Sequence, residues 1–152
     1  MGIFDFVKSA GEKLFNLNPA KKAADVLSEH IRSFKLGNDD LKIEHDGNTV
    51  KVSGEVANQE EKEKILLALG NVEGVEKVEE ALTIAAPAAP DPVFYTVKSG
   101  DTLSAIAKEF YGKASLYNAI FEANRPLLSH PDKIYPGQVL RIPPLEPKPV
   151  KV

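Results

Sequence analysis

The chain has 152 residues, of which 43% are hydrophobic and 27% are charged, a composition typical of one ordinary or two small globular domains. It contains no cysteine, which excludes disulfides, cysteine-ligated metal centres and a thiol nucleophile. No run approaches the ~18 apolar residues that a membrane-spanning helix needs. The absence of tryptophan and the net charge of −3 argue against a nucleic-acid-binding surface.

The first residues, MGIFDFVKSAGEKLF, predict a short helical extension. Asp5 and Lys8 interrupt the apolar positions, so the segment lacks the unbroken apolar run of a secretory signal. We therefore expect a cytoplasmic protein without stable membrane association. In an alternative interpretation, the bulky apolar residues of this segment form a membrane-surface anchor: Ile3, Phe4, Phe6 and Val7.

A helix and a hairpin are predicted next. Asn18 is a good N-cap and Pro19 a good first-turn residue, and apolar residues then recur at helical spacing as far as Gly37. Alternating apolar and polar residues flank Asp46-Gly47, a dipeptide that favours a tight hairpin turn.

A second helix and a last strand complete the N-terminal domain. Asn58 and Glu61 have the spacing of a capping box at the start of a helix. The last strand is expected over residues 78–84. The order helix–strand–strand–helix–strand predicts a small α+β domain with helices on one sheet face, over residues 1–84 with the helical extension included.

Residues 85–92, AAPAAPDP, predict a linker in extended polyproline II conformation, which would reach roughly 25 Å. Residues 1–86 carry 11 Lys and Arg against 16 Asp and Glu, whereas residues 87–152 carry 8 against 6. Opposite net charges on two tethered domains favour docking within the chain. Chance variation between small domains accounts for them equally well.

The C-terminal domain is expected over residues 93–143, followed by a disordered Pro-rich tail at 144–152. A strand leads to a tight turn at Gly100, and Asp101 is the expected cap of a helix that Gly112 ends. A second short helix over 115–124 and a closing strand after residue 134 give the order strand–helix–helix–strand.

Both halves resemble known domain families. Residues 94–107, FYTVKSGDTLSAIA, with the closing IYPGQVLRIP of residues 134–143, resemble a LysM domain. The element order over residues 20–84, with Gly54 after a Val-rich strand, resembles a BON domain. LysM domains generally bind N-acetylglucosamine-containing glycans, which implies a groove between residues 100–103 and 134–137. Binding of peptidoglycan or another such glycan is therefore the alternative function.

No catalytic constellation is present in the sequence. The three histidines share no spacing that would make a metal site, and no serine stands in a nucleophile elbow. No glycine-rich phosphate-binding loop occurs either. We expect a binding protein rather than an enzyme, with no catalytic residues and no organic cofactor.

The BON–LysM combination resembles a family of small bacterial potassium-binding proteins, through stretches that include Phe6-Val7-Lys8, EKEKIL at 61–66 and Gly70-Asn71-Val72. The resemblance implies a K⁺ sensor that changes shape on ion binding. Selective K⁺ sites use several neutral oxygens, and carbonyls become available at helix C-termini and glycine-containing turns. By the resemblance, the ligands are main-chain oxygens of Val7, Ala10, Glu12, Gly70, Val72 and Val75. From the residues alone, residues 7–12 and 70–75 are better interpreted as ordinary helix ends whose carbonyls are satisfied by water.

The expected partners follow from this hypothesis. K⁺ is the ligand, and K⁺ binding is expected to dock the LysM domain on the BON domain within one chain. We expect a monomer that reports to a downstream protein partner, which the sequence does not identify.

Overall fold

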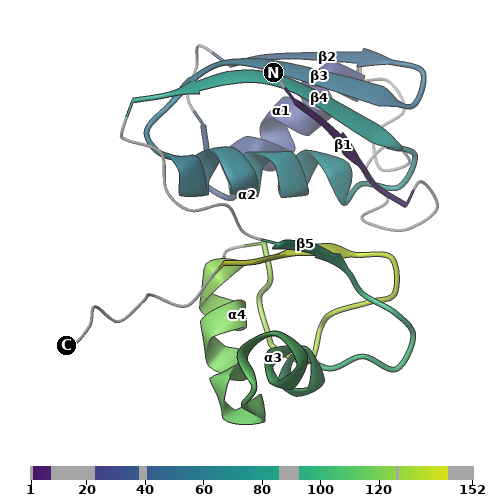
Figure 1. Cartoon of the computed structure of the whole chain (residues 1–152). Helices are drawn as coiled ribbons and strands as arrows, with labels where there is room; N and C mark the ends of the chain where they lie inside the picture. Colours follow the sequence, from purple (N-terminus) through teal and green to yellow (C-terminus); the bar gives the residue numbers. More distant parts are fainter. Residues whose placement is uncertain (1, 8–22, 38–40, 86–92, 126, 144–152) are drawn as a thin grey trace.

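The computed structural model describes residues 2–7, 23–37, 41–85, 93–125 and 127–143. The N-terminal domain is a four-stranded sheet with two helices against one face (Figure 1). Its elements are β1 (Gly2–Asp5), α1 (Ala23–Ser33), β2 (Lys42–Asp46), β3 (Thr49–Val56), α2 (Gln59–Gly70) and β4 (Lys77–Ile84). The strand order is β1-β4-β3-β2. The predicted order helix–strand–strand–helix–strand is confirmed, with β1 added at the sheet edge.

Local sequence chemistry fixes the connections of this domain. β2 and β3 pair antiparallel around Gly47, whose φ of +64° suits a hairpin turn. The side chain of Asn58 accepts a hydrogen bond from Glu61 N at 2.8 Å and caps α2, as predicted. α2 then crosses over, so β3 and β4 pair in parallel. Alternate residues of β3 and β4 face the helices and form the core, among them Val50, Val52 and Val78.

The prediction of a helix at the extreme N-terminus is wrong for residues 2–5, which form the edge strand β1 antiparallel to β4. The two-residue period of a strand explains the burial of its side chains. Phe6 is buried and Phe4 packs against the core, while Ile3 is 62% exposed. These residues do not present one common apolar surface, so the structure does not support the membrane-anchor interpretation. The predicted helix start at Asn18-Pro19 lies outside the described residues.

The C-terminal domain has the predicted order strand–helix–helix–strand. It consists of β5 (Val93–Thr96), α3 (Leu103–Tyr111), the 3₁₀ turn η2 (Ala114–Leu116), α4 (Tyr117–Ala123) and β6 (Val139–Ile142). Gly112 ends α3 with φ +82°, as predicted. The cap of α3 is Thr102, however, and not Asp101. The Asp101 carboxylate instead accepts hydrogen bonds from the Tyr95 hydroxyl at 2.5 Å and from Lys98 N at 2.8 Å.

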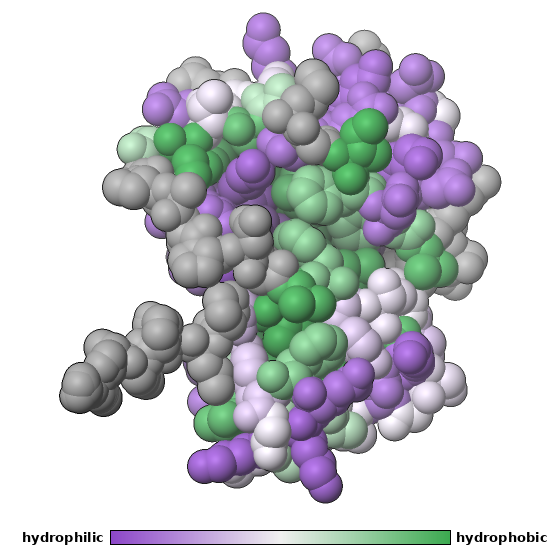
Figure 2. Space-filling model, in the orientation of Figure 1, coloured by the Kyte–Doolittle hydropathy of each residue, from purple (hydrophilic) through white to green (hydrophobic). Residues whose placement is uncertain are grey.

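Strand β6 lies between the two domains, and all four of its residues are buried. Leu140 and Ile142 belong to the C-terminal core, whereas Val139 belongs to the N-terminal core. Phe94 of β5 packs edge-to-face on Phe4 of β1, with ring centroids 5.3 Å apart. On the face shown in Figure 2, apolar residues gather around the junction of the domains. The described parts of the two domains therefore share a packed interface.

Residues 86–92 of the predicted linker at 85–92 and the whole predicted tail at 144–152 lie outside the described residues, so their predicted conformations stay predictions. Within the described residues, no helix has the length and apolar character that crossing a bilayer requires.

Candidate functional site

Three of the predicted ligand positions lie where α2 ends and turns into β4. α2 ends at Gly70, and Asn71 N–H closes its last turn on Leu67 O at 2.9 Å. Residues 71–76, named the α2–β4 loop below, then lead to β4. Val75 N–H donates to Val72 O at 3.0 Å, and Gly74 has φ +102°, a conformation that favours glycine.

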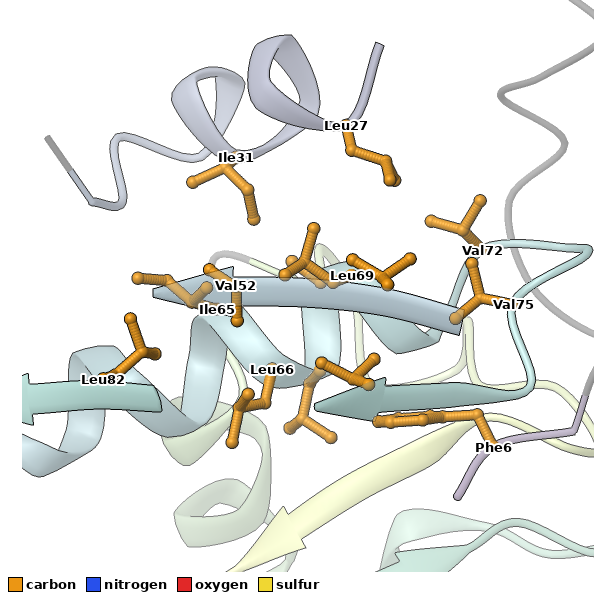
Figure 3. Close-up of a cluster of buried hydrophobic side chains, with 14 of the residues drawn as sticks. Phe6, Leu27, Ile31, Val52, Ile65, Leu66, Leu69, Val72, Val75 and Leu82 are labelled. Carbon is orange, nitrogen blue, oxygen red and sulfur yellow. The ribbon is translucent and has the colours of Figure 1, made fainter. Parts of the chain in front are cut away.

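Core side chains anchor this loop. Val72 and Val75 have no exposed surface, and Figure 3 shows both at the same end of the core as Phe6. Because these side chains point inward and are apolar, only the main chain at these positions offers polar atoms to a ligand. A cation site here would therefore be built from carbonyl oxygens.

The N-terminal segment lies against the same loop. Phe6 N–H donates to Glu76 O at 2.8 Å, and the buried Phe6 ring packs directly on Gly70. A Cβ at Gly70 would lie less than 3.0 Å from three atoms of that ring, closer than real Cβ atoms approach. Val7 follows Phe6 and is 39% exposed. The structure thus brings residues 6–7 beside the α2–β4 loop, while Ala10 and Glu12 lie outside the described residues.

The electrostatics of the loop favour a cation. The C-terminus of a helix carries a partial negative charge, and α2 has no basic residue in its last turn to offset it. The loop itself contains Glu73 and Glu76 and no basic residue. Within the described ranges, no group of three or more His, Asp or Glu side chains is placed to hold a metal ion. Main-chain oxygens are neutral, and neutral oxygens suit a large monovalent ion better than Ca²⁺ or Mg²⁺, which prefer carboxylates.

The α2–β4 loop also contacts the C-terminal domain directly. Asn71 Nδ2 donates to Val139 O at 2.9 Å, and Val139 N donates to Asn71 Oδ1 at 2.9 Å. Earlier on α2, Glu63 forms a buried ion pair with Arg141, with Arg141 Nη2 2.7 Å from Glu63 Oε1. Gln59 Nε2 donates to the other oxygen of Glu63 at 2.8 Å, so the carboxylate is well satisfied.

Sequence reasoning missed these interdomain residues. The sequence analysis assigned no role to Glu63 or Arg141 and singled out Asn71 only as part of the stretch Gly70-Asn71-Val72. One signal was present: Arg141 is a charged residue between Leu140 and Ile142 in the closing strand. The structure shows that this strand packs against α2.

A separate cavity of about 420 Å³ lies on the C-terminal domain. Thr102 and Leu103 line one side, as predicted for the glycan groove, but His130 and Asp132 line the other side instead of residues 134–137. Tyr135 lines a small cavity between the two domains instead.

Comparison with protein-family models matches residues 21–86 to the BON domain and residues 95–143 to the LysM domain. The chain is 49% identical over 148 residues to the potassium binding protein Kbp of Escherichia coli, covering 94% of this chain and 99% of Kbp. It is 36% identical over 131 residues to an uncharacterized protein of Deinococcus radiodurans, covering 80% of this chain and 51% of that protein. A 53-residue match at 53% identity to a Mycobacterium tuberculosis esterase covers 35% of this chain and 11% of the esterase.

These matches confirm the BON and LysM resemblances and the α+β fold class. The matched families are binding domains, and the esterase match covers a small part of that enzyme. The prediction of a non-enzymatic protein is therefore confirmed.

Proposed function

Since the chain belongs to the family of two-domain BON–LysM proteins that includes the Escherichia coli potassium binding protein Kbp, we propose that it binds K⁺ through main-chain oxygens of its BON domain. The observation that carries the proposal is the α2–β4 loop, where a helix C-terminus without a basic residue meets the N-terminal segment. The proposed ligands in the described residues are the carbonyl oxygens of Val7, Gly70, Val72 and Val75. Those of Ala10 and Glu12 would complete the site.

The proposed mechanism begins with repulsion between carbonyl dipoles. Without an ion, the oxygens of the α2–β4 loop and of the N-terminal segment disfavour one another's approach. K⁺ bridges the two segments and stabilises the arrangement in which Phe6 covers Gly70. A ligand shifts a conformational equilibrium by its differential affinity for the two states, so K⁺ favours the state with the segments joined.

Docking of the LysM domain belongs to the same proposal. The α2–β4 loop makes two hydrogen bonds to β6, so the conformation of the loop and the position of the LysM domain are linked. We expect K⁺ to favour the docked arrangement and to make the protein more compact. A change of shape on ion binding is the output a sensor needs.

The test is calorimetry and small-angle scattering on the full chain, exchanged out of K⁺ and titrated with KCl or NaCl at matched ionic strength. We expect saturable heat and a smaller radius of gyration with K⁺ alone. Equal responses to both salts would refute selective binding. A saturable K⁺ heat with an unchanged radius of gyration would refute the compaction.

A pair of glycine variants locates the site. Gly74→Ala strains the α2–β4 loop at φ +102° and is expected to weaken K⁺ binding. Gly47→Ala places a milder strain, at φ +64°, in the β2–β3 hairpin, and K⁺ binding should be unchanged. Equal affinities of the two variants for K⁺ would place the ion elsewhere.

The 420 Å³ cavity supports a second candidate function, binding of an N-acetylglucosamine-containing glycan by the LysM domain. Chitooligosaccharide titration should then shift the amide signals of Thr102 and Asp132. Signals that stay unchanged over the whole glycan titration would refute this function, whatever the response to K⁺.

A further inference from the structure

Asn71 completes the open edge of strand β6 from the other domain. Among the described strands, β6 pairs with β5 alone, along one of its two edges. On β6, the N–H and the C=O of Val139 are both bound by the side-chain amide of Asn71, each at 2.9 Å. A single amide side chain that binds both polar groups of one strand residue acts like the main chain of a neighbouring strand.

The next residue on the same edge is held in the same way from inside the LysM domain. Asn124 Oδ1 accepts from Arg141 N at 2.9 Å, and Asn124 Nδ2 donates to Arg141 O at 3.0 Å. Two asparagines therefore bind alternate residues of β6, one from each domain. Since Asn124 is 1% exposed and fixed by its own fold, β6 presents Val139 to Asn71 in a defined position.

The position of Asn71 in the chain places this interdomain contact next to the proposed K⁺ ligands. Asn71 stands between Gly70 and Val72, two of the proposed K⁺ ligands, and its own N–H closes the last turn of α2. The interdomain cavity beside it has a volume of about 20 Å³, room for about one water molecule. A rotation of the loop main chain would therefore move the Asn71 amide off Val139 within a tightly packed interface.

We infer that Asn71 couples the ion site to the LysM domain: the loop conformation that binds K⁺ is the one in which the Asn71 amide matches the edge of β6. The inference rests on the proposed function. Coupling free energy is reciprocal, so docking of the LysM domain must strengthen K⁺ binding by the same factor as K⁺ strengthens docking.

The ion pair between Glu63 and Arg141 provides an independent contact between the domains. Glu63 lies about two helical turns before Gly70, and its carboxylate is bound by Gln59 and Arg141. Arg141→Ala therefore weakens docking without altering the loop. Arg141→Ala also removes a positive charge, and the removal of this charge would by itself strengthen K⁺ binding. A loss of K⁺ affinity in this variant therefore cannot be caused by the lost charge.

The test is a double-mutant cycle in the full chain, with K⁺ affinity measured by calorimetry. Asn71→Ala and Arg141→Ala should each weaken K⁺ binding, by about fivefold or more. Their combination should weaken it little further, because docking is already lost in either variant. The Val139 amide signal should shift in Asn71→Ala, since its hydrogen-bond acceptor is removed. Asn71→Ser, too short to bind both groups of Val139, replaces Asn71→Ala if that variant does not fold.

Two results would overturn the inference. If the two losses of affinity multiply in the double variant, Asn71 acts on the loop locally and does not couple it to the LysM domain. If Asn71→Ala retains wild-type K⁺ affinity, the side chain has no role in binding. Failure of the proposed function is a separate result, since the unmodified protein would then show no saturable K⁺ binding, and the inference would fail with it.

Discussion

The contact between Phe6 and Gly70 can be tested with a single methyl group. Gly70 is helical, and Gly→Ala in an exposed helix interior raises the free energy of unfolding by about 1 kcal/mol. Here the new Cβ would lie less than 3.0 Å from the Phe6 ring. That ring is buried, and its main chain is tied to Glu76, so it cannot swing away freely. We therefore expect Gly70→Ala to lower the free energy of unfolding by about 1–3 kcal/mol, the usual cost of overpacking.

The assay is urea denaturation of four proteins: unmodified, Gly70→Ala, Phe6→Leu and the double variant. Phe6→Leu alone should destabilise by removing buried ring atoms. In the double variant, the smaller leucine leaves room for the new methyl group. The loss of unfolding free energy in the double variant should therefore be about 1 kcal/mol smaller than the sum of the losses in the two single variants. A neutral or stabilising Gly70→Ala, or strictly additive costs, would show that Phe6 does not pack on Gly70.

Three further predictions concern the interface, the fold and the pH response. Glu63→Gln should lower the free energy of unfolding by about 3–5 kcal/mol, because it leaves the buried Arg141 without its counter-charge, and Glu63→Gln with Arg141→Met should recover part of that loss in urea denaturation. Asn58→Ala should cost about 1 kcal/mol in the same assay by removing the cap of α2. The hydrogen bond to Asp101 raises the pKa of Tyr95 from 10.0 to about 12. The protonated phenol thus stabilises the fold below pH 10 and loses that effect as the pH rises towards 12. Near-UV absorbance should report this late ionisation, and Asp101→Asn should lower the pKa.

Each of these three predictions has a result that would contradict it. A double variant no more stable than Glu63→Gln would show that the charge of Arg141 is not what destabilises the single variant. An unchanged stability of Asn58→Ala would show that its side chain does not cap α2. A Tyr95 that ionises at its ordinary pKa would show that the bond to Asp101 is absent in solution.

Features set by neighbouring residues could be predicted from the sequence. The hairpin turn at Gly47, the cap at Asn58 and the end of α3 at Gly112 each depend on residues a few positions apart. The prediction that Asp101 caps α3 is wrong because the Asp101 carboxylate binds the hydroxyl of Tyr95 instead. Tyr95 lies on the preceding strand, so this competing partner is not visible in the residues around the helix start. β1 was missed because its conformation depends on pairing with β4, far along the chain.

The candidate site also combines local features, which the sequence indicates, with long-range contacts, which it does not. The glycines and the helix end at residues 70–75 are local features, and the sequence indicated them as a place where carbonyls become available. The contacts that join this place to the LysM domain link residues 68 and 78 positions apart, Asn71 with Val139 and Glu63 with Arg141. Nothing in either local sequence specifies such a partner, because the pairing depends on how two domains pack.

The central claim is that main-chain oxygens beside the α2–β4 loop bind K⁺. It is tested most directly by ¹H–¹⁵N NMR titration of the full chain, exchanged out of K⁺, with KCl and NaCl at matched ionic strength. The account predicts that the amide signals of residues 70–76 and of Phe6 and Val7 shift and saturate with K⁺ and not with Na⁺, and that Val139 shifts with them. Identical, non-saturating shifts with both salts would contradict it.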